Sequence, residues 1–349
     1  MWQTTNRTPF AAHGYPVRDA VGCEHWGVTV RGSFDLPGEP GGHVALAERQ
    51  APVALAPDHY DDGEELLADP DPCPFRPGCD VTLVGVAHPP AGRAVKRFPV
   101  RLAVGPIDKT IDCYGPRAWR RTRLGGEIEL LGPAEPTPLS WRQTTGGLEV
   151  TPPRARKGEA PEPRLHRENP IGAGWISAPA RLPLGKPHPL PPLAPADLPP
   201  DTPPNRLRPV GFGAVAPGWP VRARLAGTFD TAWEETRHPL LPVDFDPAFW
   251  HAAPADQRAD LRGGEAVTVS SVDPDGDLAF RLPQVLLSSR VQLRGRTEEV
   301  RLRLVSVQVD AEFRRLTMVW CAAVPCPGAD TQVRGATVRM RQAAAVDLA

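Results

Sequence analysis

The chain has 349 residues, of which 41% are hydrophobic and 6% aromatic, which suffices for one large domain or two ordinary ones. Its 45 prolines and 32 glycines exclude an architecture of long helices, because proline lacks the amide donor that a helix interior needs. Lys plus Arg is 40 and Asp plus Glu is 41, and a net charge of −1 excludes a general electrostatic attraction to nucleic acid or anionic membranes.

The N-terminal residues show no basic stretch followed by an apolar core, so we expect no signal peptide. No window approaches the roughly eighteen apolar residues of a membrane span. Six cysteines without a repeating frame are predicted to be free thiols in a reducing compartment, namely Cys23, Cys73, Cys79, Cys113, Cys321 and Cys326. We therefore expect a cytoplasmic protein.

Residues 1–150 are predicted to form an N-terminal β half. Residues 26–36 alternate with period two, as a strand with one buried face does. Short strands separated by turn residues are typical of a sandwich or barrel. Further strands are expected at 43–56, 81–87, 97–105, 107–115, 126–132 and 146–152, with a hairpin at Gly105-Pro106 and one helical turn at Glu64–Ala68.

Residues 151–208 are predicted to be a proline-rich connection of extended, polyproline-like chain. Within it, the sequence RENPIGAGWIS at 167–177 places Trp175 and two isoleucines among glycines, which favours a docked loop over a free linker.

Residues 209–349 are predicted to form a C-terminal β half. Strands are expected at 222–233, 265–272, 277–283, 298–310 and 315–324, with one more after Pro327. The apolar phase changes between Leu304 and Val305, which indicates a bulge or a strand buried on both faces. A short helical insert is expected near 246–261, because Asp246 can cap it and Pro247 suits its first position.

Gly32-Ser33-Phe34-Asp35 and Gly227-Thr228-Phe229-Asp230 align without gaps, which suggests an internal duplication. Phe34 and Phe229 should then be buried on equivalent strands. Trp233, Phe245 and Phe249 should pin residues 233–261 against the second sheet, since aromatic side chains bury the most apolar area. We predict a mainly β fold of two related β-sandwich or barrel-like halves, with mostly antiparallel strands, few short helices and long proline-rich loops.

Two motifs have a structural explanation. Residues 211–216 match the dinucleotide-binding fingerprint, but that motif must open a helix, and Pro217 and Pro220 follow it here. Residues 273–277 resemble the start of a calcium loop, yet Leu278 and Gln284 stand where an EF-hand needs glycine and glutamate. We interpret the second motif as a tight turn between strands.

The remaining candidates also favour structural roles. No nucleophile motif is present, and neither a metal nor a cofactor is expected. A metal site at His238, Asp244, Asp246 and His251 lacks the spacing that places two ligands on one helix face, and the pairs Cys73/Cys79 and Cys321/Cys326 have the wrong loop lengths for zinc. Asp35 and Asp230 could form a carboxylate pair or accept turn amides. Arg117, Arg120, Arg121 and Arg123 near Trp119 could bind phosphate or form a solvated face.

Several long segments resemble one bacterial family, domain of unknown function 2169. They are NRTPFAA (6–12), WGVTVRGSFDL (26–36), PGCDVTLVGVAHPP (77–90), ENPIGAGW (168–175), PVGFGAV (209–215) and, between 225 and 265, LAGTFDTAW, RHPLLPVDFDPAFWHAAPADQ and LRGGE. Residues 61–76 and the stretch before ENPIG look shortened relative to this family.

The resemblance implies a role beside type VI secretion systems, where members are encoded next to spike and effector genes. It implies a non-enzymatic adaptor or chaperone that binds a cognate effector toxin and helps load it onto the VgrG or PAAR spike tip, with no nucleic-acid or membrane partner. The alternatives are a structural component of the secreted spike and, third, an uncharacterised hydrolase-like enzyme. The resemblance assigns no catalytic, cofactor, metal or partner-binding residue.

Overall fold

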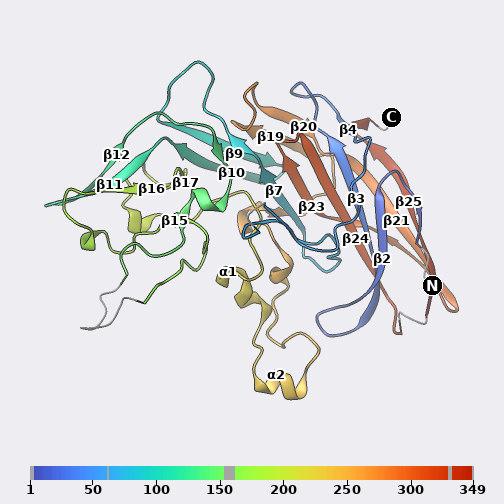
Figure 1. Ribbon diagram of the computed structural model, residues 1–349. Coiled ribbons are helices and arrows are strands. Elements are labelled where there is room, and N and C mark those ends of the chain that lie inside the picture. Colours follow the sequence, from blue (N-terminus) through green and yellow to red (C-terminus); the bar gives the residue numbers. More distant parts are fainter. Residues whose placement is uncertain (1–3, 61–62, 153–161, 329–331, 348–349) are drawn as a thin grey trace.

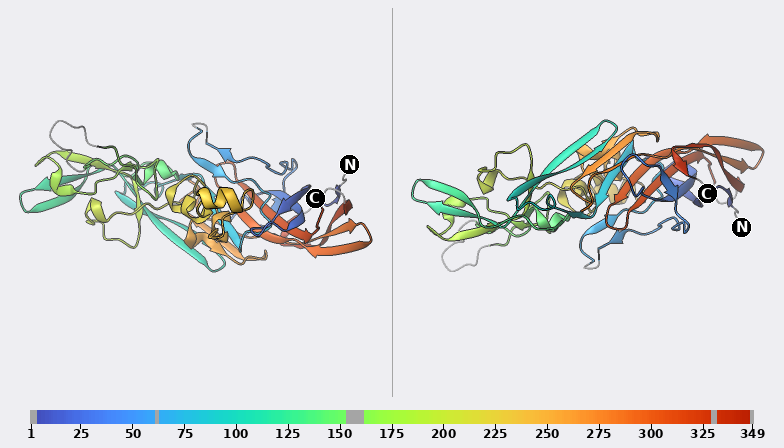
Figure 2. Two further views of the ribbon diagram at one scale, coloured as in Figure 1. Left: turned by 90° about the horizontal axis from the view of Figure 1, so that it is seen from below. Right: turned by 90° about the horizontal axis from the view of Figure 1, so that it is seen from above.

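The computed structural model describes residues 4–60, 63–152, 162–328 and 332–347. The described chain is mainly β, with only short helices, and the molecule is elongated (Figures 1 and 2). The predicted fold class is thus confirmed, and most strand pairs are antiparallel.

The largest sheet combines strands from both ends of the chain. Its order is β18-β7-β23-β24-β3-β4-β26, with β2 also pairing with β3. The strands are β2 (Ala11–Arg18), β3 (Glu24–Asp35), β4 (Val44–Leu46), β7 (Cys79–Val84), β18 (Arg258–Ala259), β23 (Arg303–Asp310), β24 (Arg315–Pro325) and β26 (Val346–Asp347). The predicted hairpin between the strands expected at 298–310 and 315–324 is confirmed, because β23 and β24 pair antiparallel.

Two further sheets flank the same core. The five-stranded sheet, in the order β17-β10-β9-β19-β20, contains β9 (Arg97–Val104), β10 (Ile107–Tyr114), β17 (Leu193–Pro195), β19 (Ala266–Ser270) and β20 (Leu278–Arg281). The four-stranded sheet, in the order β1-β25-β21-β22, contains β1 (Thr4–Arg7), β21 (Gln284–Leu293), β22 (Arg296–Arg301) and β25 (Val333–Ala344). One continuous cluster of buried side chains draws on all three sheets.

A fourth sheet, of three strands, extends the molecule at the end where the green ribbon lies in Figure 1. Its strands are β11 (Arg117–Thr122), β12 (Gly125–Leu130) and β16 (Pro187–Leu190). Trp119 packs with Ile176, Leu182 and Leu190 in a separate small core. Short pairs complete the sheets: β5 (Asp58–His59) with β6 (Leu66–Ala68), β8 (Val86–Ala87) with β13 (Thr137–Pro138), and β14 (Thr145–Gly146) with β15 (Ala173–Gly174).

The helices are single turns or little more. The α-helices are α1 (Pro220–Ala223) and α2 (Thr231–Thr236), and the 3-10 turns are η1 (Trp141–Gln143), η2 (Pro179–Arg181), η3 (Pro204–Arg206), η4 (Arg224–Ala226), η5 (Pro247–Trp250) and η6 (Ala255–Gln257). Proline begins several of them, where its missing N–H has no helical partner to lose.

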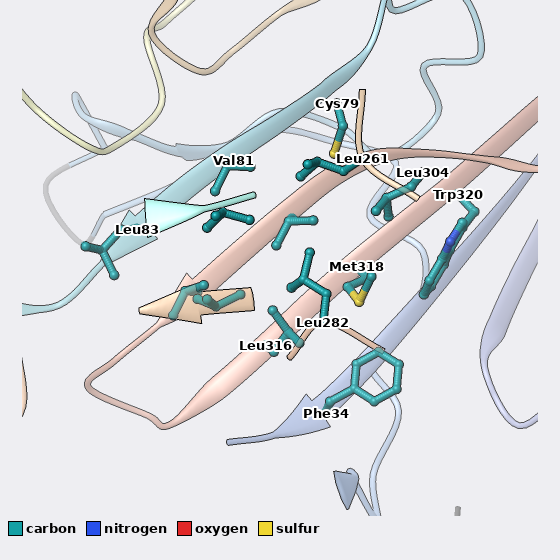
Figure 3. Close-up of a cluster of buried hydrophobic side chains, with 14 of the residues drawn as sticks. Phe34, Cys79, Val81, Leu83, Leu261, Leu282, Leu304, Leu316, Met318 and Trp320 are labelled. Carbon is teal, nitrogen blue, oxygen red and sulfur yellow. The ribbon is translucent and has the colours of Figure 1, made fainter. Parts of the chain in front are cut away.

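The main core follows the alternation of the central strands. Phe34 on β3, Met318 and Trp320 on β24, and Val81 and Leu83 on β7 are each at most 2% exposed. Figure 3 shows these side chains gathered on one face of the sheet, with Leu261 and Leu282 among them. The predicted phase change is confirmed as a bulge, because the register between β23 and β24 shifts between Leu304 and Ser306.

The predicted equivalence of Phe34 and Phe229 is wrong. Phe34 is fully buried on β3, whereas Phe229 is 55% exposed in the loop before α2. Strands from residues 1–150 and 209–349 alternate within the same sheets, as β3 does with β24 and β9 with β19. The four-residue match therefore joins a strand segment to a loop segment and does not indicate a duplication.

Residues 162–208 of the proline-rich connection are more ordered than predicted. β16 and β17 each form the edge of a sheet, against β11 and β10. Proline is tolerated there because an edge strand has one side without ladder hydrogen bonds. Residues 153–161 of the connection lie outside the described residues.

The short helical insert predicted near 246–261 consists of two 3-10 turns, of which Asp246 caps the first by accepting a hydrogen bond from Ala248 N and Pro254 precedes the second. Four other local predictions fail. Glu64–Ala68 contains β6, not a helical turn. Residues 222–233 contain helical turns instead of a strand. The strand predicted at 146–152 is reduced to Thr145–Gly146, and the strand predicted at 43–56 is reduced to Val44–Leu46.

Residues 227–246 form a projecting lobe that carries α2 (Figure 1). The indole of Trp233 lies edge-on to Phe229, at 4.8 Å, and to His238, and its Nε1 donates to Leu240 O at 2.8 Å. The prediction that Trp233 pins this segment against a sheet is therefore wrong. Phe245 and Phe249 are half-buried and pack against each other and Trp250.

We expect Trp233→Ala to loosen the lobe while changing the global free energy of unfolding by less than about 1 kcal/mol, because local opening does not require the sheets to separate. Hydrogen exchange should show lost protection confined to residues 227–246. A loss of 3 kcal/mol or more, of the order expected for truncating a core aromatic, would contradict this assignment.

Candidate functional site

The second face of the largest sheet is polar yet covered. On β7, Val81 and Leu83 face the main core, so Asp80 and Thr82 face the opposite side. The segments 67–71 and 250–253 lie over this face, leaving a cavity of only about 30 Å³ lined by Asp80, Thr82 and residues of β23 and β24. Charged side chains there are consequently removed from water.

Asp80 is the centre of this face and is 2% exposed. His251 Nδ1 donates to its Oδ1 at 2.5 Å, and the backbone N–H groups of Ala252 and Ala253 donate to Oδ2 at 2.7 and 3.2 Å. Arg76 Nε lies 3.5 Å from Oδ2. Burial by itself would raise the pKa of Asp80, but Arg76 and the His251 hydrogen bond outweigh it and hold that pKa below its usual value.

Two buried arginines fasten the covering segment. Arg76 donates to Trp250 O at 2.8 Å and to Val305 O at 3.0 Å. Arg222 donates to Phe249 O at 2.9 Å and to Val215 O at 2.8 Å, and it forms a two-bond pair with Asp69. We call Asp69, Arg76, Asp80, Arg222 and His251 the buried charged cluster. It joins β7, the 65–76 segment, α1 and the 249–253 segment.

A second group of buried polar side chains holds the glycine-rich motif at residues 211–216 in place. Lys109 Nζ donates to Gly211 O at 2.7 Å and to Gln257 Oε1 at 2.8 Å, and Gln257 Nε2 donates to Phe212 O at 2.9 Å. Burial lowers the pKa of Lys109, and Asp256, at 2.9 Å, partly offsets this. A Cβ on Gly211 would lie 3.1 Å from the ring of Trp141. The motif is thus a core loop, and its glycines allow close packing.

An open pocket adjoins the cluster. This central pocket has a volume of about 260 Å³ and is lined by Trp141, Glu168, Pro209, Val215, Val221, Arg222, Arg224, Leu225, His251, Pro254, Ala255 and Arg258. Trp141 forms an edge contact with Trp219 at 5.6 Å and donates to Gly213 O, so its position is fixed. The pocket combines cationic groups with apolar walls.

The Asp80–His251 pair has the geometry of the base half of a catalytic triad. Nucleophilic catalysis also needs an activated hydroxyl or thiol within hydrogen-bond reach of the imidazole. The described residues that line the central pocket include no serine, threonine, cysteine or tyrosine. Its arginines and apolar walls suit binding of anionic and apolar groups.

The predicted candidates are dispersed. Asp244 accepts hydrogen bonds from Thr228, Asp246 caps η5 and His251 binds Asp80. Within the described parts of the chain, no group of three His, Cys, Asp or Glu side chains could hold a metal. The turn at residues 273–277 joins antiparallel β19 and β20, as predicted.

The remaining candidates have structural partners. Asp35 pairs with Arg315, and Asp230 caps α2 by accepting from Trp233 N. The prediction of a solvated arginine face is wrong for Arg117, which is 3% exposed, lies 4.0 Å from the Tyr114 ring and donates to Pro191 O. None of the six cysteines forms a disulfide, which confirms the prediction of free thiols.

Sequence reasoning missed Asp80, Arg76 and Arg222 as a site. The available signal was a charged residue next to an apolar strand, in the sequence CDVTLVGVA. Alternation indicates that Asp80 lies on the second face, but it does not indicate that loops distant in sequence cover that face. His251 was considered only as a metal ligand.

Comparison with known proteins gives one match. A family model described as "Uncharacterized protein conserved in bacteria (DUF2169)" matches residues 21–321. No curated protein and no solved structure matches the chain. Of the helices in the described ranges, none has the length and apolar character needed to cross a membrane.

Proposed function

The chain belongs to the DUF2169 family of bacterial proteins, and from this membership we propose that it is a non-enzymatic adaptor of type VI secretion. In this proposal it acts in the cytoplasm, binds one cognate effector and helps load that effector onto the VgrG or PAAR spike tip. It needs no cofactor, and neither nucleic acid nor membrane is its partner.

The composition of the central pocket is the observation that carries the proposal. Its walls offer arginines, a histidine, Glu168 and apolar side chains, and the described residues lining it include no hydroxyl or thiol nucleophile. The charged groups nearest to the pocket hold loops together. Arg222, for example, pairs with Asp69 and donates hydrogen bonds to two backbone carbonyl oxygens. Such a site suits recognition of another protein, where arginine and aromatic side chains contribute most of the binding energy.

The expected result is that the tagged chain, expressed in its native cell, retains one effector or spike-tip protein encoded beside it. Deleting its gene should reduce delivery or stability of that effector and leave other effectors secreted. Mass spectrometry of the retained proteins and of the secreted fraction measures both effects. Complementation with the intact gene is the control.

Other outcomes select the alternatives. Loss of all secretion would identify a core part of the machine. Recovery of the chain itself with the secreted spike would favour a structural spike component. Turnover that disappears in His251→Gln would favour the hydrolase alternative, because His251 is the group in the pocket that could accept a proton with a carboxylate behind it.

A further inference from the structure

The central pocket continues into a neighbouring one. This side pocket has a volume of about 450 Å³ and is lined by Arg164, Leu165, His166, Arg167, Glu168, Trp175, Leu207, Arg208 and Pro209. Glu168 and Pro209 line both pockets. We call the two together the basic groove. The two pockets therefore adjoin at these two residues.

Three arginines in the groove are not matched by protein carboxylates. Arg164, Arg208 and Arg222 pair with Glu149, Asp197 and Asp69. Among the described residues, no carboxylate forms an ion pair with Arg167, Arg224 or Arg258. Glu168 is the single carboxylate among the described residues that line the groove. The unpaired positive charge therefore exceeds the negative charge there.

Arg258 is the most informative of the three. It is half-buried, and its Nε and Nη2 both donate to Ala253 O, at 2.9 and 2.8 Å. Burial lowers the pKa of its guanidinium, and the neighbouring Arg222 and Arg76 also lower it, while Asp80 and Asp256 offset only part of this effect. A carboxylate placed beside Arg258 would compensate both the lost hydration and the repulsion between the arginines.

The walls between these charges are apolar. Trp141, Val221 and Leu225 line the central pocket, and Trp175 and Leu207 line the side pocket. The groove thus combines cationic groups with surfaces that accept apolar side chains. Charge complementarity and these apolar surfaces together specify the chemistry of an occupant.

We propose that the basic groove binds an extended segment of a client protein in which acidic side chains alternate with apolar ones. This inference rests on the proposed adaptor function and names where and how the client is recognised. A peptide suits the groove better than a nucleic acid for two reasons. Glu168 at its middle repels phosphates but accepts peptide N–H groups, and Trp175 already contacts His166 at 4.9 Å and Arg164 at 5.7 Å, which restricts base stacking.

The test is binding of three labelled probes to the full chain by fluorescence anisotropy. They are a short peptide alternating Glu and Leu, the same peptide with Lys in place of Glu, and a single-stranded oligonucleotide. The acidic peptide should bind tightest, with affinity falling as salt rises. The double variant Arg167→Glu/Arg224→Glu should weaken it at least about tenfold. Both residues are exposed, so folding should persist. Arg301→Glu, exposed on β22, is the matched control and should leave binding unchanged.

Equal binding of the acidic peptide to the double variant and the intact chain would overturn the inference. Tighter binding of the oligonucleotide would overturn it in favour of a nucleic-acid site. The native client separates this inference from the adaptor proposal. If the double variant still retains the client, the groove assignment fails and the adaptor function stands. If the intact chain binds the acidic peptide through the groove but retains no client, the adaptor function fails instead.

Discussion

Replacing Asp80 by asparagine is expected to lower the free energy of unfolding by about 3–5 kcal/mol. The substitution conserves shape but leaves Arg76, which is 4% exposed, without its charge partner. It also weakens the hydrogen bonds that His251, Ala252 and Ala253 donate to the carboxylate. Denaturant unfolding of the two proteins measures the difference.

Asp35→Asn is the matched control. Asp35 also lies on the largest sheet and pairs with an arginine, but its side chain is 48% exposed. Solvent screening limits such a pair to about 1 kcal/mol or less. Equal, small effects of the two substitutions would show that the buried charged cluster does not hold the covering loops in place.

The effect of Asp80→Asn should depend on pH. The folded-state pKa of Asp80 lies below its usual value of about 3.9, so its contribution to stability is fully present above that value. The contribution is lost as pH falls through the folded-state pKa. The stability difference between the two proteins should therefore be constant near neutral pH and shrink below about pH 4. A difference that stayed constant into acid would mean that the carboxylate charge is not the cause.

Local patterns in the sequence predict strands well where buried and exposed residues alternate regularly. β3, β9, β10 and β24 fall within a few residues of their predicted positions, whereas the single strand predicted at 298–310 is divided at Leu302 into β22 and β23, which lie in different sheets. Period two is a property of each strand, so it survives without knowledge of the partner strand. Strand order is different, because it places β3 beside β24 and β9 beside β19, strands that lie far apart in the sequence. The alternation pattern holds no information about such pairing, and for this reason the sequence predicts two separate β halves.

The candidate site was less predictable for a related reason. The members of the buried charged cluster come from four segments, and the nearest pair in sequence is Arg76 and Asp80. A charged residue is normally expected at the surface, so the sequence alone assigns these side chains to solvent. They become a site only when loops close over the polar face of the sheet. The aromatic segment 227–246 shows the opposite error. Its sequence predicts core residues, but Trp233 and Phe229 pack within their own lobe.

Trp320→Ala is expected to destabilise the protein by about 3–5 kcal/mol, since it removes a large side chain from the main core and leaves a cavity. Trp320 is 2% exposed on β24, between β3 and β23. Its ring stacks on Phe10 at 5.8 Å, and Phe10 in turn contacts Phe34 at 5.6 Å. The truncation therefore affects the central strands and the N-terminal segment together, and thermal or denaturant unfolding measures it.

The large effect should be specific to the position of Trp320. Val243→Ala, at an 84% exposed site in the lobe, should change stability by no more than about 0.5 kcal/mol. Trp320→Phe should recover part of the loss, because a smaller ring still packs against Phe10 and fills some of the cavity. Because β24 links residues 24–35 to residues 303–310, the alanine variant should unfold in one transition. Two separate transitions would mean that the N-terminal and C-terminal strands do not form one cooperative unit.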